Sequence, residues 1–174
     1  MYTAQVGNLL ELIEDLKLDG IQNAANGIGP MGRGIAGAIR KAGGDAIMQD
    51  AFKMCSAQDP QPGQAYSTIA GFLRARGVLR IIHAVTMKEP GGPTSYDIVR
   101  DAFRSAIDLA KKESITRLGC TALATGVGGL DSKIVAEMMG HIADEAEGIE
   151  IAFVDFDKRF IETLNKKKTM KNED

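Results

Sequence analysis

Short apolar runs alternate along this chain with stretches in which apolar residues recur at every third or fourth position. The runs are rich in residues typical of buried strands, and the three-to-four spacing is typical of helices with one buried face. Such alternation favours helices layered on a largely parallel sheet, an α/β fold. The expected strands cover residues 2–6, 20–25, 64–69, 79–85, 116–123 and 150–156.

Three helices can be predicted together with their first residues. Residues 94–112 carry an amphipathic pattern, and Thr94 with Asp97 resembles a capping box at its start. Further helices are expected after Asp131 and after Asp157, because an aspartate carboxylate can accept hydrogen bonds from the free amides of a first helical turn.

The length and composition limit the classes of protein to consider. A chain of 174 residues fits one domain, which we place at residues 1–165, followed by a flexible charged tail at 166–174. The net charge of −2 supplies no broad positive field, so strong general binding of nucleic acid is not expected. Cys55 and Cys120 are far apart and are expected to be reduced core residues of a cytoplasmic protein. No apolar run is long enough to span a membrane. We expect a monomer with no cofactor.

The two histidines do not carry an obvious site. His83 lies in an apolar strand and is expected to be a core residue, while His141 falls on the exposed side of a helix. Neither histidine has the paired cysteine or carboxylate spacing that ligates zinc, so no metal site is predicted.

Two glycine-rich loops are the most informative motifs. Residues 23–34 read NAANGIGPMGRG and lie between a predicted strand and a helical pattern, and residues 124–130 read ATGVGGL after the apolar run 117–123. Glycines beside the start of a helix leave backbone N–H groups free to bind anions. Two such loops suit two linked phosphates, which indicates a nucleotide-diphosphate site.

The first loop also has the spacing of a dinucleotide-binding fingerprint, since residues 27–32 match G-x-G-x-x-G. That fingerprint requires an apolar strand before the loop, whereas Asn23 and Asn26 stand here, and the acidic residue due about 20 positions on could only be Asp45 or Asp50, inside a helical stretch. An NAD-dependent oxidoreductase therefore remains only as a weaker alternative. The sequence contains no G-K-[ST] tripeptide, which argues against a P-loop NTPase.

Taken together, several segments resemble the macro domain family over nearly the whole chain. They are IQNAAN at 21–26, GRGIAGAI at 32–39, IIHAV at 81–85, ATGVGG at 124–129 and the last strand with its flank at 149–157. The resemblance implies a three-layer α/β/α domain with a mixed, mostly parallel six-stranded sheet. It also implies that ADP-ribose binds in a cleft at the strand ends, so that ADP-ribose or an ADP-ribosylated substrate is the expected partner.

The resemblance also assigns residues to this ligand. Phe156 would cover the adenine, unless it is an ordinary core residue, and Asn8 stands nearest to the aspartate that accepts the adenine amino group. Asn26 would hydrogen-bond the distal ribose, or else only form a turn. The full set of expected ligand-binding residues is Asn8, Ile21, Gly32, Arg33, Gly34, Ile35, Ala124, Thr125, Gly126, Val127, Gly128 and Phe156.

Two departures from the family pattern concern the chemistry. Many catalytic macro domains carry a water-activating aspartate just after the first glycine run, where this chain has Ala36 and Gly37. Many members place an aromatic residue in the second loop, where this chain has Gly128, so a more open distal pocket is expected.

The segments at 30–35, 93–96 and 129–131 resemble a subgroup similar to the terminal ADP-ribose protein glycohydrolase. In that subgroup a lysine attacks the anomeric carbon of the distal ribose and an aspartate assists. Asp131 matches that aspartate, and Lys88 lies within one residue of the place of the lysine. With Asn26 they form the expected catalytic set. Two plainer interpretations stay open, namely that Asp131 only caps its helix and that Lys88 is a solvated loop charge.

The sequence therefore predicts a protein that binds ADP-ribose and hydrolyses ADP-ribosyl linkages or ADP-ribose derivatives. The alternative is a non-catalytic ADP-ribose reader, which the missing water-activating aspartate favours.

Overall fold

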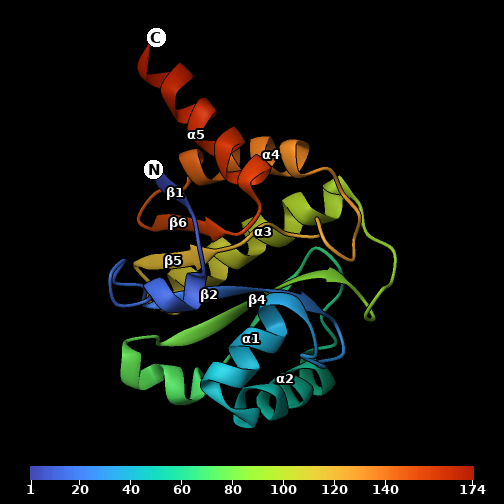
Figure 1. Cartoon of the computed structure of the whole chain (residues 1–174). Coiled ribbons are helices and arrows are strands. Elements are labelled where there is room, and N and C mark those ends of the chain that lie inside the picture. Colours follow the sequence, from blue (N-terminus) through green and yellow to red (C-terminus); the bar gives the residue numbers. More distant parts are fainter.

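The computed structural model describes residues 1–174 and contains one six-stranded sheet with strand order β1-β6-β5-β2-β4-β3 (Figure 1). All neighbouring strands are parallel except β3 and β4, which run antiparallel. This confirms the predicted mixed, mostly parallel sheet. The strands are β1 (Tyr2–Val6), β2 (Gly20–Asn26), β3 (Ala65–Thr68), β4 (Arg80–Met87), β5 (Arg117–Cys120) and β6 (Glu150–Asp155).

Helices cover both faces of the sheet and complete the three predicted layers. The bundle formed by α3 (Tyr96–Lys112), α4 (Ser132–Glu145) and α5 (Lys158–Asn172) packs on one face. The other face carries α1 (Gly34–Gly43) and α2 (Asp45–Gln58), together with the short 3-10 helices η1 (Leu9–Leu12) and η2 (Gly71–Arg76). Figure 1 shows α4 and α5 above the sheet and α1 and α2 below it.

Two apolar cores result, one on each face. Ile21 and Ile81 lie opposite each other on β2 and β4 and face the α1 and α2 layer, whereas Phe103, Phe153 and Phe160 meet in the core under α3, α4 and α5. Strands that are buried on both faces read as continuous apolar runs rather than as alternating patterns. This is why the sequence shows runs instead of strict alternation.

The predicted helix starts hold in two of three cases. Asp131 caps α4 by accepting hydrogen bonds from Lys133 N and Ile134 N, and Asp157 caps α5 by accepting one from Phe160 N. At α3 the capping residue is Ser95, whose hydroxyl accepts a hydrogen bond from Ile98 N, so the prediction of Thr94 is wrong by one residue. Serine fills this role because its oxygen reaches the amide three residues on.

The end of the chain is helical further than the pattern indicated. α5 buries Phe160, Ile161 and Leu164 and then continues to Asn172 with mostly exposed side chains. The expected division at residue 165 stays a prediction. None of the helices combines the length and the hydropathy that crossing a bilayer requires.

Candidate functional site

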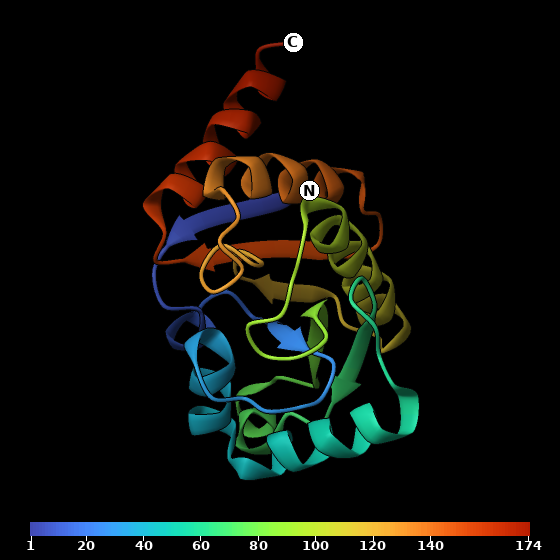
Figure 2. The same ribbon diagram turned by 90° about the vertical axis from the view of Figure 1, so that its right-hand side faces the viewer.

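An open cleft of about 680 Å³ lies at the edge of the sheet where parallel strands end. In Figure 2 the loops that follow β2, β4 and β5 gather around this edge. The chain leaves β2 toward α1 on one face of the sheet and leaves β5 toward α4 on the other. Ligands of open α/β sheets bind where successive connections diverge in this way.

The residues that line the cleft come from two strand ends and three loops. They are Ala24, Ala25, Asn26, Pro30, Gly32, Arg33, Gly34, Ile35, Ala36, Thr86, Met87, Pro90, Gly91, Ala122, Ala124, Thr125, Gly126, Val127 and Gly128. The structure thus brings together both predicted glycine loops, including all five ligand-binding residues expected in the second loop.

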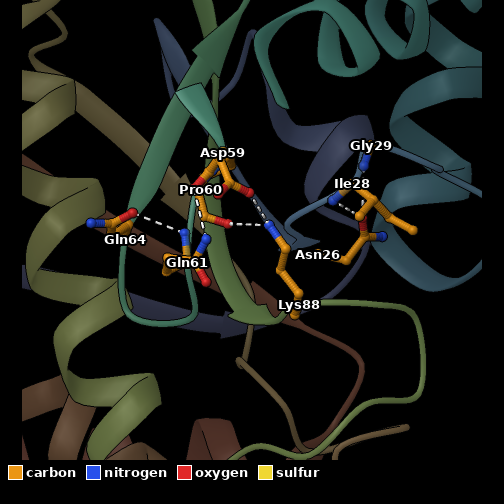
Figure 3. A network of polar contacts seen from close by, with 8 residues as sticks. All are labelled: Asn26, Ile28, Gly29, Asp59, Pro60, Gln61, Gln64 and Lys88. Atoms are coloured by element: carbon orange, nitrogen blue, oxygen red, sulfur yellow. Dashed lines mark hydrogen bonds and ion pairs between the residues drawn. The ribbon is translucent and has the colours of Figure 1, made fainter. Parts of the chain in front are cut away.

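The Asn26 side chain organises the first loop. Its Oδ1 accepts hydrogen bonds from Ile28 N (3.0 Å) and Gly29 N (2.8 Å), and its Nδ2 donates to Pro30 O (3.0 Å). Figure 3 shows the contacts with Ile28 and Gly29. The side-chain amide has two N–H donors, and the second has no partner in the protein. Asn26 therefore shapes the turn, one of its donors remains for a ligand, and its contact with the distal ribose stays a prediction.

The loop can take this path because residue 27 is glycine. Gly27 N donates to both Met87 O and Lys88 O, and a Cβ at this position would lie 2.5 Å from Pro60 O. Any larger residue would clash with this carbonyl, so that the first loop or the segment at Pro60 would have to shift.

Both walls of the cleft present backbone amides without partners. Gly34, Ile35 and Ala36 form the first turn of α1, and their amides donate no hydrogen bond within the protein. The same holds for the four amides from Thr125 to Gly128. Free amides at a helix start and in a glycine loop form a site for anions.

The cleft contains one charged side chain, that of Arg33. The other lining residues are apolar or carry neutral polar groups, such as Thr86, Thr125 and Asn26. No carboxylate, histidine, cysteine or lysine lines it. The cleft therefore suits an anionic ligand and holds no side chain that would act as a general base near neutral pH.

Asn8 and Phe156 lie beyond this lining, at the ends of neighbouring strands. β1 and β6 pair as far as Val6 and Asp155, and Gly7 N donates to Asp155 O. Asn8 Oδ1 accepts a hydrogen bond from Leu10 N and so caps η1. Phe156 is 72% exposed, so the alternative that it is an ordinary core residue is wrong.

Ile21 does not reach the cleft. Its side chain is fully buried in the core between the sheet and the α1 and α2 layer. The residue lies in the middle of the pairing with Ile81 on β4 and with Gly119 on β5. The prediction that the Ile21 side chain contacts the ligand is therefore wrong. A side chain at this position in the sheet supports the site only through packing.

The Lys88 side chain is not part of the cleft lining. Its Nζ lies 2.5 Å from Asp59 Oδ1 and 3.4 Å from Pro60 O. Figure 3 shows both contacts. Hydrogen bonding from Lys88 lowers the pKa of the Asp59 carboxyl. Lys88 is therefore an ion-paired residue in this structure rather than a freely solvated charge.

Asp131 is also engaged outside the cleft. Besides capping α4, its carboxylate lies 3.5 Å from Arg159 Nη2, and its backbone N–H donates to the Tyr96 hydroxyl. The hydrogen bond from Ile134 N is the main cause that lowers the pKa of this carboxyl. Asp131 thus caps α4 as predicted, and its expected catalytic role stays a prediction.

His83 is a core residue, as predicted. Its two ring nitrogens contact Asn23 Nδ2 (3.0 Å) and Thr68 Oγ1 (2.8 Å), and its ring stacks on Tyr66. Burial lowers the pKa of His83 to about 3. Both cysteines are free and buried, and the structure brings together no three His, Cys, Asp or Glu side chains able to hold a metal ion.

Sequence reasoning missed the contribution of β4 and one supporting carboxylate. Thr86 and Met87 at the end of β4 line the cleft, and the signal for them was the end of a buried parallel strand. Asp155 accepts hydrogen bonds from Ala122 N and Asp157 N, and so ties the second loop to the end of β6. A lone aspartate after a strand gives no such signal in a sequence.

A larger groove of about 920 Å³ runs between α4 and α5. Charged side chains of both signs line it, with a single apolar residue, Met170. It lies within one helical layer and away from the strand ends, and it lacks the apolar walls typical of small-molecule sites. The cleft at the strand ends is therefore the stronger candidate.

Comparison with known proteins places these features in a family. The family model described as Macro domain matches residues 22–139. An uncharacterised protein of Aquifex aeolicus is 36% identical over 161 residues, which cover 88% of this chain and 92% of that protein. The O-acetyl-ADP-ribose deacetylase of Escherichia coli K12 is 34% identical over 128 residues, which cover 72% of this chain and 71% of that enzyme.

Solved structures agree on the fold. The macrodomain of Mycobacterium tuberculosis DarG superimposes with a TM-score of 0.76 at 21% identity, over 89% of this chain and 97% of that one.

Proposed function

Because this chain belongs to the Macro domain family, we propose that it binds ADP-ribose in the cleft at the strand ends and hydrolyses ADP-ribosyl linkages or ADP-ribose derivatives. One observation carries the proposal. Unpaired amides of the first turn of α1 and of Thr125–Gly128 line the same cleft. Two anion cradles that share one cleft match the two linked phosphates of ADP-ribose.

Further residues on the same edge support the proposal. Phe156 offers an exposed ring on which the adenine can stack, and Asn8 offers a side-chain amide at the end of the neighbouring strand. Asn26 offers its free N–H to the distal ribose. The name of the E. coli relative, O-acetyl-ADP-ribose deacetylase, supports the same ligand.

Calorimetric titration of the wild type and Asn26→Ala with ADP-ribose tests binding, with AMP, ADP and NAD as comparison ligands. Micromolar binding of ADP-ribose corresponds to about 8 kcal/mol and should weaken in the variant. Binding of NAD in preference to ADP-ribose would support the oxidoreductase alternative instead. That alternative lacks its carboxylate in the structure, since neither Asp45 nor Asp50 lines the cleft.

For hydrolysis we propose that Lys88 acts as nucleophile and that Asp131 assists. The loop that starts at Lys88 supplies Pro90 and Gly91 to the cleft wall. Lys88 must leave Asp59 and become neutral to attack the anomeric carbon of the distal ribose, because only the neutral amine is nucleophilic. The new C–N bond would replace the bond from this carbon to the modified group, which would leave with a proton, and water would then release ADP-ribose from the lysine. Lys88→Ala and Asp131→Ala should abolish release of ADP-ribose from an ADP-ribosylated substrate while calorimetric affinity is retained. Unchanged turnover in both variants would remove these two roles.

One observation favours a non-catalytic reader as the second candidate. Lys88 and Asp131 are both engaged elsewhere, and the cleft lining contains no acid or base. Reproducible production of ADP-ribose from O-acetyl-ADP-ribose or from a modified protein, followed by chromatography, would rule out this candidate.

We further propose that the protein works as a monomer in the cytoplasm. Two free, buried cysteines support a reducing compartment. Light scattering coupled to gel filtration should give a mass near 18.6 kDa.

A further inference from the structure

Arg33 differs from every other residue of the cleft in its charge. It is the one charged residue of the lining, it is exposed, and it forms neither an ion pair nor a side-chain hydrogen bond within the protein. Arginine stays protonated at all ordinary pH values and binds phosphate with two parallel hydrogen bonds. A free guanidinium in a cleft without carboxylates is therefore available to a ligand.

The position of Arg33 is unfavourable for the protein alone. It is the N-cap residue of α1, where a side chain that accepts hydrogen bonds is preferred and arginine has none to offer. Its positive charge also stands at the positive end of the helix dipole. The starts of the other four α-helices each carry an aspartate, namely Asp45, Asp97, Asp131 and Asp157, whereas the first turn of α1 has no acidic residue. Local rules of this kind are broken most often at functional sites.

A second observation points to a ligand at the same wall. Asn26 is about nine-tenths buried, lines the cleft and keeps one N–H without a partner. The free amides of Gly34, Ile35 and Ala36 follow Arg33 directly. Arg33, Asn26 and the residues of these amides all line the cleft, and each of them offers a hydrogen-bond donor that has no partner in the protein.

The order of the strands indicates which part of the ligand meets this wall. Phe156 and Asn8 stand at the ends of β6 and β1, the second loop follows β5, and Arg33 lies beyond β2, while the sheet order is β1-β6-β5-β2. If the adenine of a nucleotide stacks on Phe156, the first phosphate would lie beside the second loop. Only the second phosphate would be close enough to contact Arg33.

We propose that Arg33 is the specificity-determining residue of this cleft, and that it selects nucleoside diphosphate ligands by pairing with the phosphate distal to the adenosine. The assignment rests on the proposed binding of ADP-ribose. The cleft would then bind nucleoside diphosphates more tightly than monophosphates, because a monophosphate would form no contact with the guanidinium.

Calorimetric titration of wild type, Arg33→Gln and Arg33→Lys with AMP, ADP and ADP-ribose tests the proposal. Arg33→Gln should weaken the binding of ADP and ADP-ribose by about tenfold or more, as expected for a lost charge-assisted hydrogen bond. The same substitution should weaken the binding of AMP by less than about twofold. Arg33→Lys should bind ADP and ADP-ribose with affinities between those of the wild type and Arg33→Gln. Arg74→Gln is the matched control, because Arg74 is exposed, unpaired and located on η2, and it should leave all three affinities unchanged.

Thermal unfolding without ligand separates this role from a structural one. Arg33→Gln should unfold at the same temperature as the wild type or slightly above it, since it removes a positive charge from a helix start. Equal losses for AMP and ADP, or unchanged ADP-ribose binding in Arg33→Gln, would overturn the proposal while leaving the proposed function intact. A wild type that binds no ADP-ribose would overturn both.

Discussion

At the scale of single residues, an exposed aromatic ring marks one end of the candidate site. Phe156 and Phe72 are 72% and 77% exposed, yet only Phe156 stands at the carboxyl end of a parallel strand. Stacking of a base on an aromatic side chain contributes about 1–3 kcal/mol. Phe156→Ala should therefore weaken ADP-ribose binding by roughly tenfold or more in calorimetry with little change in thermal stability. Phe72→Ala is the matched control, and equal losses in both variants would exclude a specific stacking role.

His83 predicts how stability responds to pH. Asn23 Nδ2 donates to His83 Nδ1, so the neutral ring carries its proton on Nε2, which faces Thr68 Oγ1. A second proton would place two donors face to face inside the core. Burial, which removes water from the ring, lowers the pKa of His83 to about 3, below the value of about 6.5 for an unfolded chain.

Because the folded pKa is the lower one, the unfolded chain takes up the proton first as the pH falls. The stability that neutral His83 supports is fully present above about pH 6.5 and is lost progressively toward pH 3, by about 2 kcal/mol at pH 5. Urea unfolding at pH 7 and pH 5 measures this loss. His83→Gln should be less stable than the wild type at pH 7, but its free energy of unfolding should fall less between pH 7 and pH 5. An equal fall in both proteins would contradict the assignment of this pH dependence to His83.

At the scale of elements, the first loop is held by one side chain, and this separates folding from binding. Asn26→Ala removes two acceptor contacts and one donor contact, which should cost about 2 kcal/mol of unfolding free energy as well as affinity. Asn26→Asp keeps the acceptors for Ile28 and Gly29 and places a negative charge beside the anion cradle.

Asn26→Asp should therefore lose less stability than Asn26→Ala while it loses more affinity for ADP-ribose. Urea unfolding measures the stabilities of the two variants, and calorimetry measures their affinities for ADP-ribose. Asn165→Ala serves as a control for losing an amide, since Asn165 is exposed and donates only to Ala4 O. The opposite ranking of the two affinities would mean that the loop shape, and not the charge in the cleft, governs binding.

The elements were predictable where burial alone decides them. All six strands lie within three residues of the expected bounds. The central strands β4 and β5 are largely buried and therefore mostly apolar, which makes them visible as runs in the sequence. The Lys88 interaction was not predictable, because its partner Asp59 lies at the end of α2 in a left-handed conformation (φ 47°) that only the packed chain defines. Likewise, the pattern gave Ile21 an apolar strand position but not the face on which it lies.

At the scale of the whole molecule, the cleft joins the two layers of helices. α1 belongs to the core on one face of the sheet and α4 to the core on the other, and the loops that lead to them form opposite walls. Loops on different faces meet only after β2 and β5 have paired, through Gly20 with Leu118 and Ile21 with Gly119. The site therefore exists only in the folded state, and a ligand bound there must stabilise the whole domain.

This coupling gives a prediction that does not depend on catalysis. A ligand that binds only the folded protein adds about 2.7 kcal/mol when its free concentration is a hundred times Kd. For a chain of 174 residues such a gain raises Tm by roughly 5–10 °C. Differential scanning fluorimetry with ADP-ribose should show this rise in the wild type and a much smaller one in Asn26→Asp at the same concentration. If AMP at that concentration gave the full rise, the second phosphate and distal ribose would add nothing, and the cleft would be an adenosine monophosphate site instead.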